Sequence, residues 1–361
     1  MKSGLDLRNC KIQGVKMYKI TATEFNNEKA TEYETKSMLY LMNYYNNRGE
    51  IAFFAIDFFN DVTGIDRYAR NLYDIQSKGV KDVQPSTLGS FLVTLFKNYL
   101  SEFGFVDFIL FIESMSPSIK RQIGDKTIFK YSDLSLSQQT SIKENLISEA
   151  KEKTYIEDKS LITEENVDNF LCKVNFVIGN KDTAQYIRDL IKVETDLNIE
   201  DSYLKKIFKE IRDHQSSKKN NGVENKVIEK IGDVFVYDKT IDISEIKILV
   251  LNRIISKHGT KFDCAMPSCF SSIYMAVDET IRDDFLEECQ NAVFKILLNK
   301  GNSDAYWTLF GEIFTLIKNN PTDDVDSLYQ KIKEKTLDDV TFLDYNSARY
   351  FVAMVKEGIK K

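Results

Sequence analysis

The alternation and clustering of apolar residues between positions 50 and 80 predict two neighbouring strands of a sheet. The run Ile51–Phe59 is apolar and rich in β-prone residues, as expected of a buried strand. Asn60, Asp61 and Gly64 are turn formers and predict a chain reversal after it. The stretch Leu72–Lys78 then alternates, so Asp74, Gln76 and Lys78 are expected on one face of a second strand.

Helical spacing of apolar residues predicts helices on both sides of these strands. The first begins at a cap, Asn26 or Asn27, and runs to about residue 46; the second covers about 87–102 and ends at Gly104. Apolar runs predict further strands over 106–112 and 173–178, and shorter helices are expected over 132–148 and 167–171. The order helix, strand, strand, helix, strand indicates an α/β layer with a mixed sheet.

The second half of the chain is predicted to be mostly helical. Helices are expected over 183–214 with a break at 196–200, then over 243–257, 270–299, 303–319, 325–336 and 345–358, with a short strand at 234–237. The polar stretch 215–225 is typical of a linker. We therefore expect an α/β domain over 1–215 and a helical C-terminal domain over 216–361 for partner binding or oligomerisation.

Composition excludes several classes of protein. With 361 residues, 43% hydrophobic and 29% charged, the chain is an ordinary globular one, and its net charge of −6 argues against binding DNA by bulk charge. Its five scattered cysteines include no CxxC pair, which disfavours a disulfide framework or a zinc site and suits the reducing cytoplasm. No apolar run reaches the roughly 20 residues of a membrane span, and no signal-peptide core is present.

The triplet Gln76-Ser77-Lys78 carries the strongest chemical signal. Other acid-x-Lys triplets occur, but this one follows a buried strand and an acidic turn that contains Asp61. A carboxylate, an amide carbonyl and an ammonium at a sheet edge are the groups needed to hold a divalent metal and a phosphate. In the alternative interpretation, Asp61 only caps a turn and Lys78 extends its ammonium into solvent.

A second acidic candidate lies on the first predicted helix. Glu34 falls within the apolar stripe and points either at the site or, by its tip, at water. Other catalytic signatures are absent from the sequence, which has no GxxxxGK[ST], GxGxxG or GxSxG motif. His214 and His258 fall at predicted helix ends, where capping is the simpler role.

These elements resemble the restriction-endonuclease-like PD-(D/E)XK core, in the variant where Gln replaces the second acid. The segments KDVQPSTLGSFLVTLFKNYLSEFGFVDFILFI and VDNFLCKVNFVIG are similar to nuclease domains of bacterial anti-phage effectors: the Cap-type endonucleases of CBASS and the nuclease subunit of Lamassu systems. The resemblance covers about residues 25–215. It implies that Asp61, Gln76 and Lys78 are catalytic, and that Glu34, Asp61 and Gln76 hold Mg²⁺ or Mn²⁺.

The identity of the metal-binding aspartate stays open at this point. Asp57, Asp66 and Asp74 all lie near the motif, and Asp66 is the second choice after Asp61. Asp61 is preferred because it follows the predicted strand directly and precedes the turn.

The helical C-terminal part favours the Lamassu-like arrangement, because it does not resemble a cyclic-oligonucleotide sensor. The resemblance then implies a double-stranded DNA substrate, control by an SMC-type ATPase and an accessory subunit, and activation through homo-oligomerisation. A second hypothesis is a non-catalytic adaptor with a degenerate nuclease fold. The two differ in whether Glu34, Asp61, Gln76 and Lys78 converge.

Overall fold

The computed structural model describes residues 18–20, 28–101, 103–191, 199–220, 223, 226–255, 266–298, 303–340 and 342–360. The chain forms two compact units, each built from segments that are distant in sequence. Unit 1 comprises residues 1–27, 55–178 and 218–240, and unit 2 comprises 28–54, 179–217 and 241–361. This division differs from the single boundary predicted near residue 215, because the chain re-enters unit 1 twice.

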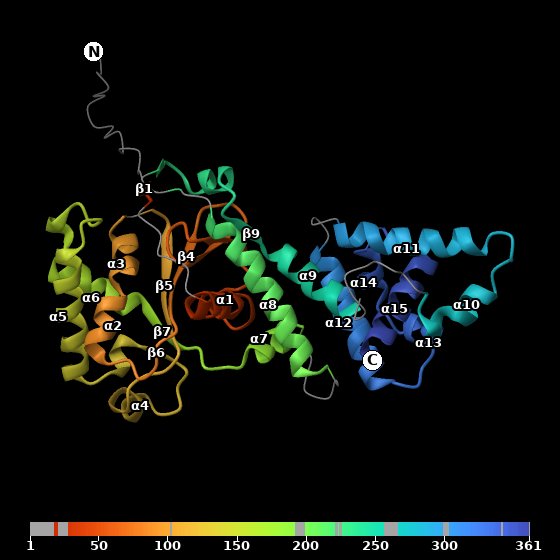
Figure 1. Ribbon diagram of the computed structural model, residues 1–361, viewed down its shortest axis with the longest axis horizontal. Helices are drawn as coiled ribbons and strands as arrows, with labels where there is room; N and C mark the ends of the chain where they lie inside the picture. The colour runs from red at the N-terminus through yellow and green to blue at the C-terminus, as the bar shows by residue number, and fades with distance from the viewer. Residues whose placement is uncertain are drawn as a thin grey trace, which may run out of the picture. The chain divides into compact units, whose positions relative to one another are not determined.

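A mixed sheet of seven strands, in the order β6-β7-β5-β4-β3-β2-β9, confirms the predicted α/β layer (Figure 1). Strand β4 runs parallel to β5 and β5 parallel to β7, whereas β3 is antiparallel to β4 and β6 to β7. The short strands β1 and β8 pair separately. The bounds are β1 Tyr18–Lys19, β2 Ile51–Ile56, β3 Val62–Asp66, β4 Leu72–Lys78, β5 Phe105–Ile112, β6 Ile128–Lys130, β7 Val174–Ile178, β8 Val227–Ile228 and β9 Thr240–Asp242.

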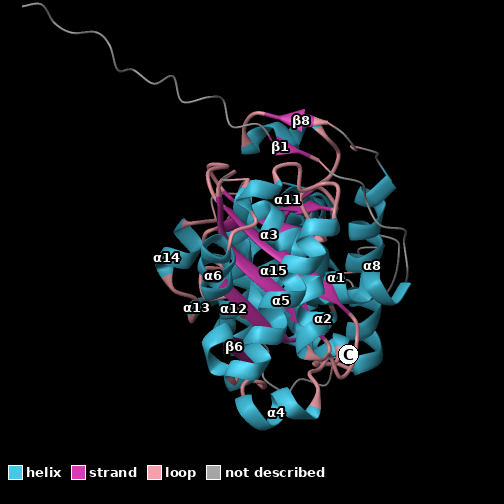
Figure 2. Ribbon diagram, turned by 90° about the vertical axis from the view of Figure 1, so that its left-hand side faces the viewer, coloured by secondary structure: helices cyan, strands magenta, loops and turns pink. Residues whose placement is uncertain are grey.

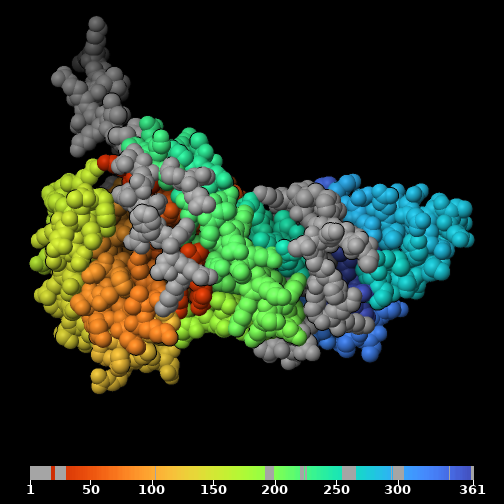
Figure 3. Space-filling view, in the orientation of Figure 1, coloured from red at the N-terminus to blue at the C-terminus, as the bar shows by residue number. Residues whose placement is uncertain are grey.

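Four helices of unit 1 cover one face of strands β4, β5 and β7. They are α2 Pro85–Phe91, α3 Val93–Leu100, α5 Leu136–Glu152 and α6 Glu164–Lys173; a shorter helix, α4, spans Pro117–Ile123. Figures 1 and 2 both place the four on the same side of these strands, and segments containing α2 and α5 form the orange and yellow surface in Figure 3. The helices bury Phe108, Leu110 and Ile112 of β5 on this face, whereas Lys78 beside Ile112 at the end of β4 stays partly exposed.

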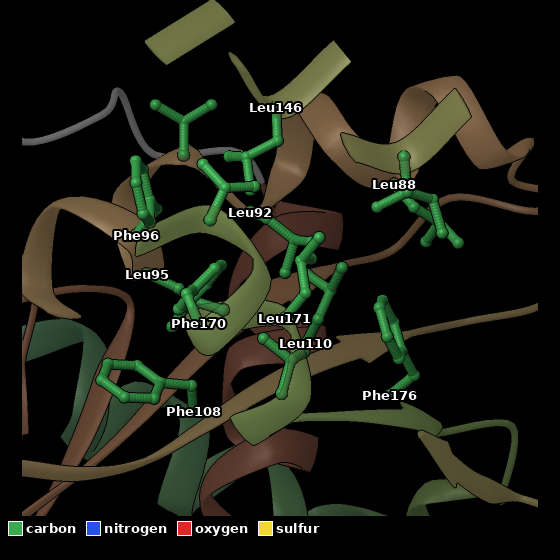
Figure 4. Packing of buried hydrophobic residues seen from close by; sticks show 14 of the residues in the cluster. Leu88, Leu92, Leu95, Phe96, Phe108, Leu110, Leu146, Phe170, Leu171 and Phe176 are labelled. Carbon is green, nitrogen blue, oxygen red and sulfur yellow. The ribbon is translucent and has the colours of Figure 1, made fainter. Parts of the chain in front are cut away.

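The core between these helices and the sheet is mostly apolar, apart from the buried pair Asp74 of β4 and Asn98 of α3. Phe96 of α3 packs against Phe170 of α6, with ring centres 5.2 Å apart, and Leu92, Leu110 of β5 and Phe176 of β7 belong to the same buried cluster (Figure 4). Residues 108–112 of β5 are all buried, which explains why this part of the strand is a continuous apolar run in the sequence. The predicted strands 72–78, 106–112 and 173–178 are confirmed, the first with its predicted bounds.

The region between β2 and β4 corrects the predicted hairpin. Strand β2 ends at Ile56, and Gly64, predicted to lie in a turn, instead belongs to the extra strand β3. All five residues of β3 are buried, so pairing with a strand on each side outweighs the turn propensity of glycine. Asn60 and Asp61 lie in the loop between β2 and β3, as predicted, and a second turn lies between β3 and β4, where Ala69 has a positive φ of 51°.

Other boundaries also shift. The predicted helix 87–102 is two helices, α2 and α3, that meet at Leu92. Gly104 has a positive φ of 73°, and the backbone oxygen of Arg70 lies close to where a Cβ would be. The position therefore requires glycine. Residues 231–236 form a 3₁₀ helix, so the strand predicted at 234–237 is wrong. The predicted linker 215–225 begins inside helix α8, and its residues 221, 222, 224 and 225 lie outside the described part of the chain.

Unit 2 is helical, as predicted for the C-terminal part. Helix α1 Glu28–Asn43 packs against α7 Thr183–Leu190 and α8 Asp201–Ser217; its predicted caps, Asn26 and Asn27, lie outside the described residues. The last helix, α15, contacts α9, α11, α12 and α13. The bounds are α9 Ile243–Ile255, α10 Ser271–Met275, α11 Arg282–Leu298, α12 Ser303–Asn319, α13 Val325–Gln330, α14 Glu334–Asp338 and α15 Tyr345–Lys360.

The long helix predicted over 270–299 is interrupted between α10 and α11, where residues 276–281 are not helical. Among the helices that the structure describes, none combines the length and apolar character needed to cross a bilayer.

Candidate functional site

Antiparallel pairing of β3 with β4 brings Asp61 beside Gln76. Val62 pairs with Ile75 and Thr63 with Asp74, so the residue before β3 lies next to Gln76 on β4. The Asn60 side-chain oxygen accepts a hydrogen bond from the Asp61 backbone N–H at 3.0 Å and fixes the entry into β3.

One carboxylate oxygen of Asp61 collects three donors from β4. Its Oδ2 accepts hydrogen bonds from Gln76 Nε2 at 2.7 Å, from the Ser77 backbone N–H at 2.8 Å and from Ser77 Oγ at 3.0 Å. Hydrogen bonds to an ionised acceptor are stronger than neutral ones, so this set holds the carboxylate firmly against the strand. The structure therefore brings together two of the three residues predicted to be catalytic.

Lys78 completes the triplet at the carboxyl end of β4. It lies two residues beyond Gln76, hence on the same face of the strand, and its ammonium lies 5.9 Å from the centre of the Phe91 ring of α2. A cation over an aromatic face is attracted by the quadrupole of the ring. Lys78 is half-buried at the edge of the sheet.

Sequence reasoning missed a carboxylate at this edge, Glu113. It follows β5 directly, and β5 runs parallel to β4 with Ile112 beside Lys78. Its backbone N–H donates to the Lys78 carbonyl at 3.3 Å, and its carboxylate lies 3.5 Å from Lys81 Nζ. The available signal was its position after a buried apolar run, because parallel strands end at the same edge of a sheet.

Asp74, an alternative metal ligand by sequence, is committed to a buried polar cluster. It is fully buried; its Oδ1 accepts from Thr63 Oγ1 at 3.1 Å and its Oδ2 from Asn98 Nδ2 at 2.7 Å. Burial raises its pKa to about 7, while hydrogen bonds, first from Asn98, lower it and the nearby Asp61 carboxylate raises it. Its two oxygens therefore stabilise the junction of the sheet with α3.

The cluster extends from Asn98 to the N-terminal strand β1. Tyr18 donates to Asn98 Oδ1 at 2.6 Å and accepts a hydrogen bond from Lys97 Nζ at 2.9 Å. Burial lowers the pKa of Lys97 to about 8, against the opposing effects of Asp74 and Glu157. These contacts connect β1, α3 and β4 by side chains alone.

The two remaining aspartates have other roles. Asp57 follows β2 with a positive φ of 50°, and its carboxylate lies 3.4 Å from Lys239 Nζ. Asp66 lies at the far end of β3 and caps the turn to β4, because its Oδ1 accepts from the backbone N–H groups of Arg70 at 2.6 Å and Asn71 at 3.1 Å. Among the four aspartates, Asp61 is the one whose carboxylate contacts Gln76.

Glu34 belongs to helix α1 of unit 2, where it is 8% exposed, within the buried stripe that the sequence indicated. Its role as a metal ligand stays a prediction.

The donor chemistry at Asp61 and Gln76 fits a hard divalent cation. A carboxylate and an amide supply oxygen ligands, and Mg²⁺ keeps several waters, so one or two carboxylates suffice. Gln76 turns its N–H toward Asp61; rotating the amide by half a turn would present its oxygen instead. Over the residues that the structure describes, no cluster of three or more His, Cys, Asp or Glu side chains is placed to hold a metal.

Comparison of the chain with protein-family models, with curated proteins and with solved structures gave no match.

Proposed function

We propose that unit 1 is a metal-dependent DNA endonuclease whose site consists of Asp61, Gln76 and Lys78. The observation that carries the proposal is the 2.7 Å contact between Gln76 Nε2 and Asp61 Oδ2, with Lys78 two residues further along the same face of β4. An acid, an amide and an ammonium at one sheet edge are the groups needed to bind a metal and a phosphodiester.

Asp61 and Gln76 would hold Mg²⁺ or Mn²⁺. The bound ion would polarise the scissile phosphate and lower the pKa of a coordinated water. The Ser77 N–H and hydroxyl orient Asp61 by sharing its Oδ2, and they stay in place when the Gln76 amide turns. Replacing the motif's second acid by an amide removes one negative charge, so we expect modest metal affinity.

Lys78 would act on the phosphate. Its ammonium is a compact charge with three donors, suited to orienting the attacking water and to stabilising the negative charge that develops on the phosphate oxygens. Contact with the Phe91 ring limits the conformations of the long side chain and so keeps the ammonium near the strand end.

The mixed sheet flanked by helices supports a restriction-endonuclease-like assignment for this core. Together with the sequence resemblance, it leads us to propose a cytoplasmic anti-phage effector of the Lamassu type. In this proposal the helices α9–α15 serve partner binding or oligomerisation, and an SMC-type ATPase with an accessory subunit keeps the nuclease inactive until release. The net charge of −6 suits a subunit that leaves DNA loading to its partners.

One observation favours a second candidate, a non-catalytic adaptor. Oδ2 of Asp61 already accepts three hydrogen bonds within the protein, which satisfies that oxygen without a metal. In an adaptor these contacts would simply stabilise the β3–β4 pair, and the helices of unit 2 would provide the functional surface.

The test is cleavage of supercoiled plasmid by the purified full chain, alone and mixed with the products of its neighbouring genes. Each mixture is incubated with Mg²⁺, with Mn²⁺ or with a chelator. The proposal predicts nicked or linear plasmid in the presence of metal and intact plasmid with the chelator. Intact plasmid in every mixture favours the adaptor, and cleavage with the chelator contradicts a metal-dependent site.

A further inference from the structure

A fully buried lysine lies at the base of the loop that carries Asp61. The Lys239 side chain is 0% exposed, and it comes from the segment 218–240 that returns to unit 1 after an excursion through unit 2. Charged side chains are almost never fully buried unless they are paired, because burial removes their solvation. The burial of Lys239 therefore calls for a specific set of partners.

Those partners satisfy all three donors of the ammonium. Lys239 Nζ donates to the Asp57 backbone carbonyl at 3.2 Å, to Asp57 Oδ2 at 3.4 Å and to the Lys219 carbonyl at 3.2 Å. An ammonium has three donors and no acceptor, so these oxygens complete its hydrogen bonding. The Lys239 carbonyl also accepts from the Ile56 N–H at 2.8 Å, which aligns the two segments.

The contacts fall on the tightest part of the loop between β2 and β3. Asp57 has a φ of 50°, a conformation that non-glycine residues adopt only at some cost, and Asn and Asp tolerate best. Its N–H donates to the Asp61 carbonyl at 3.1 Å and closes the loop on itself. Fixing Asp57 through both its backbone and its carboxylate therefore fixes the start of β3.

The charges of Lys239, Lys219 and Asp61 all act on the Asp57 carboxylate. Burial raises the pKa of Asp57 to about 6, whereas Lys239, then Lys219, oppose the rise and the Asp61 carboxylate adds to it. Since Asp57 and Asp61 repel one another, the buried ammonium offsets part of the cost of holding two carboxylates in one short loop.

We propose that Lys239 is a positioning residue that locks the Asp57–Asp61 loop so that Asp61 meets Gln76 and Ser77. This inference rests on the proposed function, because its consequence is the affinity of the Asp61–Gln76 pair for a metal ion. Lys239 acts on that pair through Asp57, to which its ammonium donates two hydrogen bonds.

The first experiment measures Mn²⁺ binding to the full chain by calorimetry, which needs no activity. Lys239→Met removes the donors and shortens the side chain by one heavy atom, and the exposed Lys226→Met in the same segment is the matched control. We expect Lys239→Met to bind Mn²⁺ at least about tenfold more weakly than wild type, and Lys226→Met to bind equally well. Equal binding by Lys239→Met overturns the positioning role.

Asp61→Asn separates this inference from the proposed function. If wild type binds no Mn²⁺, or binds it as well after Asp61→Asn, the proposed metal site fails. If Asp61→Asn abolishes binding while Lys239→Met leaves it unchanged, only the positioning role fails.

Because Lys239→Met alone could misfold, a second variant is needed that leaves no unpaired charge in the loop. Lys239→Met leaves the Asp57 carboxylate without its ammonium, so Lys239→Met/Asp57→Asn removes both charges and keeps a residue that tolerates the positive φ. Hydrogen exchange by mass spectrometry over residues 57–66 then reports the loop directly. We expect exchange to rise at least about tenfold in this segment of the double variant, and not in β5. Unchanged exchange of the loop contradicts the inference irrespective of metal.

Discussion

Gln76 on β4 donates a 2.7 Å hydrogen bond to Asp61, fifteen residues earlier, and this contact defines the candidate site. It depends on the register of β3 against β4, in which Val62 faces Ile75. A shift of one residue would turn Gln76 to the other face of the sheet and separate the two side chains. The chemistry proposed for unit 1 is therefore set by strand pairing.

Replacing Gln76 by Glu should make the site more dependent on metal. A second carboxylate beside Asp61 brings two like charges together, so Gln76→Glu should lower the melting temperature when no metal is present. Mg²⁺ would offset this repulsion, and we expect it to bind at least about tenfold more tightly than to wild type, or ~1.4 kcal/mol. The measurement is thermal unfolding with and without Mg²⁺.

Gln185→Glu is the matched control for that experiment. Gln185 donates to Asp189 at the same distance, 2.7 Å, but on helix α7 and with Lys181 3.4 Å from the same aspartate. Because that ammonium already offsets the negative charge, Mg²⁺ should stabilise Gln185→Glu far less. Equal stabilisation of the two variants would show that Mg²⁺ recognises any added acid.

Asp74 should make the protein less stable as pH rises from about 4 to about 7. Its folded pKa of about 7 lies above its ordinary value of 3.8, so in this range the unfolded chain has lost a proton that the folded protein retains. The free energy of unfolding then falls by up to about 1.4 kcal/mol per pH unit, and the effect ends above pH 7, where both states are ionised.

Asp74→Asn tests this dependence, because an amide does not titrate. Urea unfolding at several pH values should show a shallower slope in the variant, with the remaining part due to Asp57, whose raised pKa of about 6 acts in the same direction. The same slope in both proteins would mean that Asp74 is ionised throughout this range in the folded protein.

Gly89 should be required for the packing of α2 against α5. A Cβ there would lie 2.4 Å from the Ile142 carbonyl oxygen and 2.9 Å from the Leu146 nitrogen, both backbone atoms of α5. Gly89→Ala should therefore destabilise the protein by about 1–3 kcal/mol, as overpacking does.

Gly311→Ala is the opposite case, because a Cβ at that position in α12 meets nothing within 4 Å. Alanine at a helix interior should stabilise by ~0.5–1 kcal/mol. Denaturant titration of both variants decides the point, and a stable Gly89→Ala protein would contradict the close approach of α2 to α5.

The sequence predicted the strands whose pattern is local. Strand β4 alternates and β5 ends in the apolar run 108–112, so both could be recognised without knowledge of their neighbours. Strand β3 could not, because Gly64 is a turn former that follows Asn60 and Asp61 closely, and pairing on both sides places it in a strand. The division into two discontinuous units was not predicted for the same reason, because contacts between distant segments leave no local signal in the sequence.

The site shows the same limit. The sequence suggested Gln76 and Lys78 from their spacing and position, but it left four aspartates open until the register placed Asp61 beside Gln76. Lys239 was missed, because in a lysine-rich chain nothing in the sequence distinguishes a buried lysine from a solvated one. Its partner Asp57 lies 182 residues away along the chain.

The most direct test of the proposed site compares plasmid cleavage by wild type, Asp61→Asn, Lys78→Ala and Lys81→Ala, each in the mixture that gives cleavage. Lys81 lies three residues beyond Lys78, is 70% exposed and pairs with Glu113, so it controls for the loss of a positive charge at this edge. We predict at least about a hundredfold loss of cleavage in Asp61→Asn and Lys78→Ala, and near wild-type cleavage in Lys81→Ala. Cleavage that survives in either of the first two would place the catalytic site elsewhere.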